Sequence, residues 1–324
     1  MNKNVLVTVL FLCAVMICTS CDKNEPKGED EIVGIEDISF ENFPKMDGST
    51  SCKALNEMIA CKLLGIRYEW DAFGYMGFEW GLRFNMEDIP EKYQDFFEKR
   101  VITSQTNGAF MNLIDGKADI VLTHRTISPD EKAHADDIGV MLIETPIALD
   151  AFVFVVNKNN PVKSLTVKQV QKIYKGEITN WQQVGGNNAN IKVFTRPRNS
   201  GSEEVFRKIV MGDLEPLDFP EAAIGMMILV FGEVSENVDA ICYTFDNYKE
   251  VIARERGREV SKLEINGIFP SEATVKNETF PFISKVHVAI RSNLDHNSMA
   301  YRLYEWLQTE NVKPVLKECG FVTK

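Results

Sequence analysis

The chain is short of the residues from which metal centres and nucleophilic sites are usually built. It has 324 residues and four histidines, and no two histidines show His-x-x-x-His spacing. The cysteines beyond residue 21 match no metal-binding spacing. There is no Gly-x-Ser-x-Gly elbow, and no histidine is paired by motif with a nucleophile. These absences argue against a metalloenzyme or a serine hydrolase, so we expect no metal, no other cofactor and no catalytic residue.

The same cysteines leave the disulfide pattern open. Cys52 and Cys61 fall on one expected helix, roughly 13 Å apart along its axis, which excludes a bond between them. Cys242 and Cys319 could pair in an exported protein, although nothing in the sequence requires it.

Positive charge is also scarce. The chain carries 36 Lys and Arg against 47 Asp and Glu, for a formal net charge of −11. A chain this acidic is a poor candidate for nucleic acid binding, so we expect no nucleic acid partner. If the chain binds an anion, local geometry must overcome an unfavourable overall field.

Long apolar runs are confined to the N-terminus. Val5–Ile17 is apolar but too short to span a bilayer comfortably, and it follows a short, positively charged start. Small residues then lead to Cys21, after which the chain turns abruptly polar. This order resembles a bacterial lipoprotein signal, with a plain secretory signal as the alternative. We therefore expect residues 1–20 to be a signal peptide, Cys21 to be the lipidated new N-terminus and residues 21–36 to be a flexible tether.

One stretch combines fixed positive charge with a turn of small residues. Ile191–Phe194 is typical of a short strand, and Glu203–Met211 has apolar residues at helical spacing. Between them lie Arg196 and the turn Ser200–Ser202, whose first or last serine suits a helix N-cap. The free N–H groups and positive dipole end at such a helix start favour an anion. An ordinary serine-capped junction without a ligand is the alternative.

Two further junctions place polar residues at the ends of expected elements. Residues 45–51 form a second turn rich in small residues, directly before an expected helix over 52–64. The apolar strand expected over 118–123 ends in His124 and Arg125. Polar residues just beyond a buried strand lie where open α/β sheets bind ligands. A solvated surface loop is the alternative for this pair.

Strands and helices alternate along much of the chain, which favours an α/β fold with largely parallel sheets. Residues 66–100 show no clear period, apart from a possible helix over 90–100. Further helices are expected over 109–115, 164–174, 220–231 and 297–308. Further strands are expected over 240–243, 262–267 and 286–290, and two are expected within 141–156.

With these motifs the chain resembles the phosphate-binding lipoproteins that feed ABC transporters, a branch of the two-lobed periplasmic binding proteins. The most specific piece is Ser164–Gly186, with a Leu-Thr start, an Ile-aromatic-x-Gly-x-Ile-x-Asn-Trp core and a closing Val-Gly-Gly. Other motifs fall in family order: Gly48–Ser51, Asp119, Arg196 with Ser200–Ser202, and Pro270–Lys276. The resemblance covers roughly residues 45–322.

The resemblance implies two α/β lobes, each a mixed sheet flanked by helices, with the ligand cleft between them. We expect lobe 1 to comprise residues 37–148 and 284–324, and lobe 2 to comprise residues 149–283. Closure of the lobes would then turn on hinges near 147–152 and 280–288.

The resemblance also implies a set of ligand-binding residues. First-lobe contacts carry over to Thr50, Ser51 and Thr106, and Thr106 stands where the family has a serine. Second-lobe contacts carry over to Arg196, Ser200, Gly201 and Ser202.

The chain departs from the family at the end of the 118–123 strand. Some members place there an Asp that accepts a hydrogen bond from the phosphate's own proton and so rejects fully deprotonated anions such as sulfate. Arg125 stands at that position here, preceded by His124, and arginine and protonated histidine both donate. Both residues are therefore candidate ligand contacts, and the selection is either lost or supplied by another acceptor, for which Asp47 and Asp150 are candidates. Cys242 replaces a glycine usual in the family.

The leading hypothesis is a non-catalytic, lipid-anchored monomer at the cell envelope, facing the periplasm or the cell surface. It would capture inorganic phosphate and deliver it to an ABC transporter permease, touching the membrane only through its lipid. The His124–Arg125 pair motivates an alternative, namely a binder of a related oxyanion, or a sensor or surface protein without a transport role. An enzyme such as a phosphatase is a third class, disfavoured by the absences above.

Overall fold

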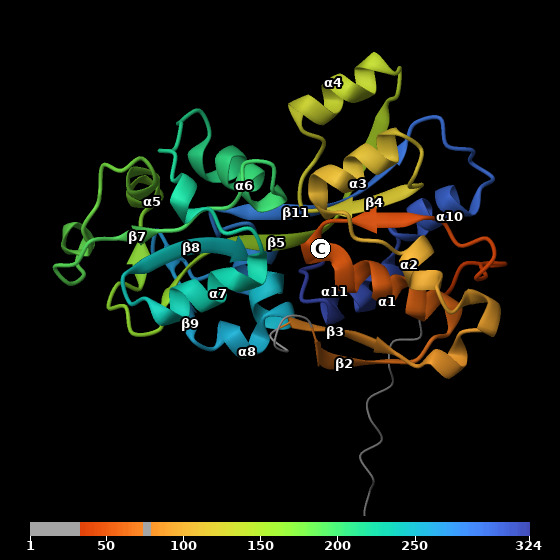
Figure 1. Cartoon of the computed structure of the whole chain (residues 1–324), viewed down its shortest axis with the longest axis horizontal. Coiled ribbons are helices and arrows are strands. Elements are labelled where there is room, and N and C mark those ends of the chain that lie inside the picture. The colour runs from red at the N-terminus through yellow and green to blue at the C-terminus, as the bar shows by residue number, and fades with distance from the viewer. Residues whose placement is uncertain (1–32, 74–78) are drawn as a thin grey trace, which may run out of the picture. The chain divides into compact units, whose positions relative to one another are not determined.

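The computed structural model describes residues 33–73 and 79–324. The expected signal peptide, Cys21 and most of the expected tether lie outside this part of the chain. Strands and helices alternate through the described residues (Figure 1). The strands are β1 (Met46–Gly48), β2 (Tyr68–Phe73), β3 (Glu79–Phe84), β4 (Ile120–Thr123), β5 (Leu142–Asn157), β6 (Ser164–Leu165), β7 (Lys192–Val193), β8 (Ala240–Phe245), β9 (Val260–Lys262), β10 (Glu264–Ile265) and β11 (Ile283–Arg291).

The helices are mostly short, and several begin or end in a tighter or wider turn. The α-helices are α1 (Lys53–Leu64), α2 (Phe96–Arg100), α3 (Gln105–Ile114), α4 (Pro129–Asp137), α5 (Val167–Tyr174), α6 (Gly201–Val205), α7 (Met227–Glu236), α8 (Arg254–Gly257), α9 (Glu272–Lys276), α10 (Met299–Trp306) and α11 (Lys313–Glu318). A 3₁₀ turn, Thr50–Cys52, leads into α1, and π-helical segments follow α6 at Phe206–Met211 and precede α8 at Tyr248–Ile252.

The main sheet is mixed. It has seven strands in the order β1–β4–β11–β5–β8–β7, with β9 also pairing with β5. Only the β1–β4 and β7–β8 pairs of this sheet are parallel, whereas β11 pairs antiparallel with β4 and β5, and β5 pairs antiparallel with β8 and β9. The expectation of largely parallel sheets is therefore wrong, because the two long strands, β5 and β11, pair antiparallel with their neighbours. The expected α/β class with mixed sheets and flanking helices is confirmed.

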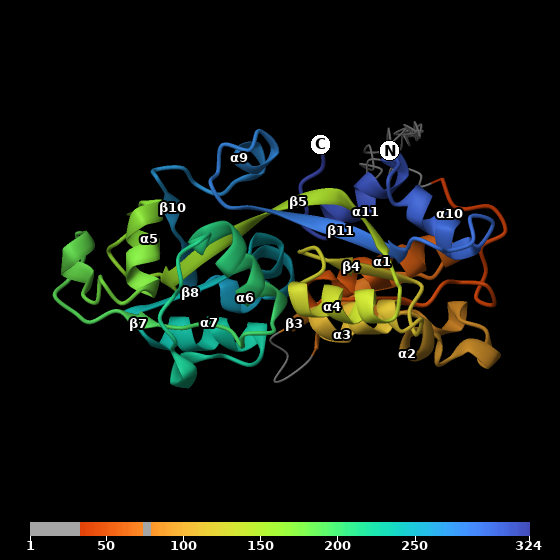
Figure 2. The ribbon, with the colours of Figure 1, turned by 90° about the horizontal axis from the view of Figure 1, so that it is seen from above.

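Two strands run through both halves of the sheet. The expected pair of strands within 141–156 is in fact one strand, β5, of 16 residues. Pro146 does not break it, because the register with β11 shifts between Val286 and His287 and the resulting bulge accommodates the proline. Figure 2 shows β5 and β11 side by side, passing from the α5 and β8 side to the α10 and α11 side.

Most other differences between the expected and the observed elements concern where a helix begins or how a short segment is folded. α3 begins at Gln105, one turn before the expected start, and α7 begins at Met227, within the helix expected over 220–231. The helix expected over 203–211 begins at Gly201 and turns into a π-helix at Phe206. Much of the unassigned stretch 66–100 forms the antiparallel pair β2–β3.

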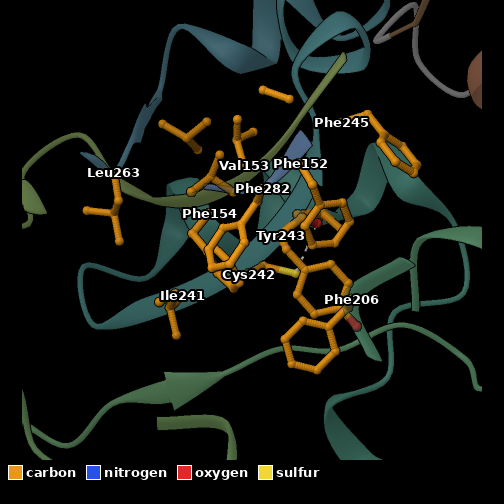
Figure 3. Packing of buried hydrophobic residues seen from close by; sticks show 14 of the residues in the cluster. Phe152, Val153, Phe154, Phe206, Ile241, Cys242, Tyr243, Phe245, Leu263 and Phe282 are labelled. Carbon is orange, nitrogen blue, oxygen red and sulfur yellow. Dashed lines mark hydrogen bonds between the residues drawn. The ribbon is translucent and has the colours of Figure 1, made fainter. Parts of the chain in front are cut away.

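The apolar core falls into two large clusters. One gathers residues from β5, β7, β8, α5, α6 and α7, and its aromatic centre includes Phe152, Phe154 and Tyr243 (Figure 3). The other gathers residues from α1, β4, α10 and α11 with Val286, Val288 and Ile290 of β11. Along β5, Ala148 belongs to the second cluster and Leu149 to the first. The strand thus passes from one core to the other at this point.

All four cysteines of the described residues are buried free thiols: Cys52, Cys61, Cys242 and Cys319. The possible Cys242–Cys319 bond is therefore absent from this structure. Burial raises the pKa of the Cys242 thiol to about 12, which keeps it protonated and unreactive. Cys242 packs on β8 among the aromatic side chains of Figure 3.

Candidate functional site

Three helix starts meet around a cavity of about 140 Å³. The segments that line it come from both expected lobes: Ser49–Ser51 before α1, Gln105 and Thr106 at the start of α3, Ser200–Ser202 at the start of α6, and Arg196. The remaining lining residues are Glu79, Gly225, Met226, Met227, Phe245 and Tyr248. The structure thus brings together every predicted ligand residue except His124 and Arg125.

Buried Asp47 connects two of these junctions. Its Oδ1 accepts from the Ser104 backbone N–H at 2.8 Å, and its Oδ2 accepts from the Asn112 side-chain amide at 2.8 Å. The carboxylate therefore ties β1 to the start of α3 and does not line the cavity. Gly48 lies beside it, and a Cβ at that position would be 2.7 Å from the Leu122 carbonyl oxygen. Only glycine allows β1 and β4 to approach this closely before the first junction.

The start of α3 is held in an uncommon backbone conformation. Gln105 has φ of 63°, in the left-handed region that side-chain-bearing residues seldom occupy. Such conformations cost of order 1–3 kcal/mol and gather at ligand sites, where surrounding structure holds them. Here both Gln105 and its neighbour Thr106 line the cavity.

The start of α6 completes the second half of the lining. Ser200 is the N-cap, and its Oγ accepts from the Glu203 backbone N–H at 3.2 Å. Gly201 packs directly against Thr106 of α3, and a Cβ on Gly201 would collide with Thr106 Oγ1. The two helix starts can therefore face each other this closely only with glycine at this position. Both direct free backbone N–H groups and a positive dipole end toward the region between them.

Arg196 supplies a buried positive charge. Its side chain donates to the Ile224 carbonyl oxygen and, at 3.4 Å, to Ser202 Oγ. Only 8% of the residue is exposed, and burial lowers the pKa of its guanidinium. It makes no ion pair with any carboxylate of the described residues. Because a buried cation without a counter-ion is unfavourable, an anion in the cavity would be strongly stabilised.

His124 lies behind the lining instead of within it. Its Nδ1 is 2.8 Å from Ser51 Oγ, and its Nε2 is 3.1 Å from Asp150 Oδ2. The imidazole is buried and stacks on Phe245, with ring centroids 3.9 Å apart. Burial raises the pKa of Asp150 to about 8. The sequence shows no motif that pairs a histidine with a nucleophile, yet the fold creates such a pair in space.

Arg125 links the two expected lobes outside the cavity. Its Nη1 and Nη2 each donate at 2.7 Å to an oxygen of Glu131 on α4, and its Nε forms an ion pair with Glu204 on α6. The guanidinium also lies over the Phe110 ring, 5.1 Å from its centroid. Its charge is therefore compensated by a carboxylate on α4 and another on α6.

Glu79 and Tyr248 add polar groups to the lining from segments in which the sequence predicted no ligand contact. Glu79 stands at the start of β3, and its Oε1 accepts from the Tyr248 hydroxyl at 2.7 Å. Burial raises the pKa of Tyr248, which keeps it a neutral donor. Residues 66–100 have no clear period, so nothing in the sequence could place Glu79 at the cavity. Beside Tyr248, the Asn247 side chain donates to the Ser51 carbonyl oxygen at 3.2 Å.

The described residues lack two features that would point to other functions. No group of three or more His, Cys, Asp or Glu side chains in this part of the chain is arranged to hold a metal ion. Over the same residues, no helix combines the length and apolarity needed to cross a membrane.

A cavity enclosed between two α/β halves, each contributing a helix start, defines the two-lobed fold of the periplasmic binding proteins. The chain belongs to the PBP superfamily domain family, whose model matches residues 85–310. Protein SphX of Synechococcus elongatus is 26% identical over 247 residues, which cover 72% of this chain and 73% of that protein. Phosphate-binding protein PstS of Staphylococcus saprophyticus is 24% identical over 227 residues, covering 68% and 69%.

A solved structure supports the same fold. An ABC-type phosphate transport receptor from Vibrio cholerae superimposes with a TM-score of 0.59 at 23% identity. The match covers 86% of this chain and 99% of the receptor chain. The similarity therefore extends over both halves of the sheet and both sides of the cavity.

Proposed function

We propose that this chain binds inorganic phosphate in the cavity between the α1, α3 and α6 helix starts and delivers it to an ABC transporter permease. The observation that carries the proposal is Arg196, a buried guanidinium in the lining that makes no ion pair within the described residues. The relatives named as phosphate-binding proteins, and the solved phosphate transport receptor, support the same ligand class.

Several residues together account for useful affinity. Micromolar binding needs about 8 kcal/mol. Charge-assisted hydrogen bonds supply roughly 1.5–3 kcal/mol each, so a few must converge on one anion. We assign them to the lining residues predicted from the sequence: Thr50, Ser51, Thr106, Arg196, Ser200, Gly201 and Ser202. His124 and Arg125 act from behind this lining, through Ser51 and through the interlobe ion pair.

Ligand capture by lobe closure is part of the proposal. Lobe 1 comprises residues 37–148 and 284–324, and lobe 2 comprises residues 149–283, which agrees with the change of core cluster at Leu149. The hinges near 147–152 and 280–288 then fall on β5 and around the start of β11. Closure excludes water and brings the α3 and α6 starts together around the anion.

The cellular setting is also a proposal, supported by the sequence. Lipidation at Cys21, after removal of residues 1–20, would tether a monomer to a bacterial membrane through residues 21–36, facing the periplasm or the cell surface. The cavity is small enough for a tetrahedral anion and carries no metal-ligand cluster within the described residues. We therefore assign the protein no catalytic role, although Ser51 and His124 lie within hydrogen-bond distance.

The first prediction tests the ligand. At about pH 9, isothermal titration of the full-length protein, purified in detergent and stripped of ligand, should show phosphate binding at micromolar affinity or better that an equal concentration of sulfate does not displace. A phosphatase assay with and without divalent metals should show no ester hydrolysis above background. Absence of binding would refute the proposal, and equal binding of both anions would support the related-oxyanion alternative.

A second prediction concerns the ion pair across the cleft. Glu204→Gln should weaken phosphate binding by about fivefold, mainly through faster release, because one half-buried charge pair stabilising the closed form is worth about 1 kcal/mol. The unfolding temperature of the ligand-free protein should change little. Lys132→Gln is the matched control, since its ion pair with Asp136 stays within α4 and is exposed. Equal effects of the two changes on the release rate would contradict a role for Arg125 and Glu204 in closure.

A further inference from the structure

A chain of hydrogen-bonding groups leads from the cavity into the interior. Ser51 lines the cavity, and its Oγ lies 2.8 Å from His124 Nδ1. His124 Nε2 lies 3.1 Å from Asp150 Oδ2. All three residues are buried, and Asp150 is only 2% exposed. Any change in the protons of the His124–Asp150 pair is therefore transmitted to the hydroxyl that faces the ligand.

The surroundings fix which atoms of the pair face each other. Asp150 Oδ1 accepts from the backbone N–H groups of Ala151 and Asn247, at 2.8 and 3.2 Å. Oδ2 is therefore the oxygen available to His124. Stacking on Phe245 holds the imidazole plane, with 3.9 Å between ring centroids. The His124 ring is thus held with Nε2 toward Asp150 and Nδ1 toward Ser51.

The proton count of the pair determines the direction of the Ser51 hydrogen bond. When Asp150 is ionised and His124 carries one proton, that proton lies on Nε2 and Nδ1 can only accept. Ser51 must then donate to Nδ1, so it presents only lone pairs to the cavity. When the pair takes up a second proton, Nδ1–H donates to Ser51, and the hydroxyl proton turns toward the ligand. Ser49 Oγ, 3.1 Å away, can donate to Ser51 in both states.

We propose that the singly protonated His124–Asp150 pair makes Ser51 a hydrogen-bond acceptor for a proton-bearing oxyanion, and that a second proton converts Ser51 into a donor. The proposal rests on the phosphate site proposed above. Phosphate carries a proton throughout the neutral range, whereas sulfate carries none, so an accepting Ser51 favours phosphate. Ser51 thereby supplies the acceptor that Arg125 cannot provide.

Other ionisable groups surround the pair. Burial raises the pKa of Asp150 to about 8, so the pair takes up its second proton as the pH falls through this value and not only in acid. Lys262 opposes this shift. The titratable groups that face the pair or act on it are Cys52, whose Sγ is 3.6 Å from His124 Nδ1, Asp246 and Lys262, which interact with Asp150, and His287, which interacts with His124. Asp246 and Lys262 form an ion pair with each other.

The decisive variant is Asp150→Asn, which keeps the shape of the side chain. It reverses the direction of the hydrogen bonds that run from Asp150 through His124 to Ser51, which we call the relay. The two backbone N–H groups retain the amide oxygen, so the amide N–H₂ must face His124 Nε2. Nε2 then accepts, the imidazole proton moves to Nδ1, and Ser51 becomes a permanent donor. At about pH 9.5, the preference for phosphate over sulfate should fall by about ten- to a hundredfold, chiefly because sulfate binds more tightly. Loss of the Asp150 charge alone would instead strengthen the binding of both anions and leave the ratio of their affinities unchanged.

The pH dependence of sulfate binding provides a second test. Sulfate does not titrate between about pH 6 and about pH 9.5, so any change in its affinity over this range comes from the protein. Isothermal titration of the full-length protein should show tighter sulfate binding at the lower pH. Asp150→Asn should lose most of this dependence. An equal dependence in both proteins would overturn the proposal.

Nitrogen-15 chemical shifts of the His124 ring test the relay without any ligand. At about pH 9.5 the natural protein should carry the proton on Nε2, and Asp150→Asn should carry it on Nδ1. The same tautomer in both would refute the relay. If Asp150→Asn does not fold, Ser51→Ala replaces it in these tests. Ser51→Ala should lower the affinity for phosphate by about tenfold. Its affinity for sulfate should change little and should no longer depend on pH.

Glu79 is the matched alternative, since it is the carboxylate of the lining and can accept from a protonated anion. Glu79→Gln should leave the pH dependence of sulfate binding and the His124 tautomer as they are in the natural protein. Should Glu79→Gln remove the preference for phosphate while Asp150→Asn leaves it intact, the acceptor is Glu79 and the relay is overturned. Failure of the natural protein to bind phosphate at all would instead refute the proposed function, while the tautomer measurement would still test the relay.

Discussion

Arg196→Met should lower the affinity for phosphate roughly a thousandfold and leave the ligand-free fold at least as stable as before. The guanidinium supplies two or more charge-assisted hydrogen bonds of about 1.5–3 kcal/mol each to a bound anion. Without an anion it is a buried cation that makes no ion pair in the described part of the chain, so its replacement by an apolar side chain removes a desolvation penalty. Isothermal titration and thermal unfolding measure the two effects separately.

Arg207→Met is the control for this change. Arg207 lies eleven residues further on, in the π-helical segment after α6, and already pairs with Glu203 and Glu215. It is not part of the lining, so the affinity for phosphate should stay within about threefold of the natural value. If Arg196→Met binds phosphate as well as Arg207→Met does, the cavity is not the anion site.

Gly201→Ala should weaken phosphate binding about a hundredfold, or by roughly 3 kcal/mol, through a purely steric effect. A Cβ at position 201 collides with Thr106 Oγ1, and Thr106 is buried with little freedom to move. The α3 and α6 helix starts must then remain further apart, so hydrogen bonds from the two lobes cannot converge on one anion. Small-angle scattering should show less compaction on phosphate addition than in the natural protein.

Gly225→Ala is a matched control on the same cavity. Gly225 also lines it, but a Cβ there would have no atom within 4 Å. The affinity of the Gly225→Ala protein for phosphate should stay within about threefold of the natural value. Ligand-free Gly201→Ala should unfold at nearly the natural temperature, because open lobes relieve the collision. Full compaction of Gly201→Ala with phosphate would show that close approach of the helix starts is not required.

Features set by neighbouring residues were predictable from the sequence. α1 and α5 lie where apolar periodicity places them, and Ser200, one of the two serine candidates, is the N-cap of α6. The most family-specific motif proves to be structural. Its Trp181 is buried, and its Gly185 ends a 3₁₀ turn with φ of 87°, a conformation that suits glycine.

Features that join distant segments were not predictable. Pro146 resembles a strand break, and only the bulge beside it, where Ile147 of β5 has no partner on β11, allows β5 to continue. The contact between Ser51 and His124 spans 73 residues, and that between His124 and Asp150 spans 26. Neither spacing corresponds to a turn of helix or a strand pair, so only the assembled sheet reveals the relay. For the same reason the Arg125–Glu204 ion pair could not be inferred from either residue's neighbours.

The position of β11 has a consequence for how the chain folds. This strand lies in the sheet between β4 and β5, yet it is the last strand to be synthesised, and α10 and α11 follow it. The first half of the chain therefore cannot close its sheet until nearly all of the polypeptide is present. Contacts this distant in sequence slow folding. Because β5 and β11 also run through both cores, the two lobes should melt together in a single cooperative transition instead of one after the other.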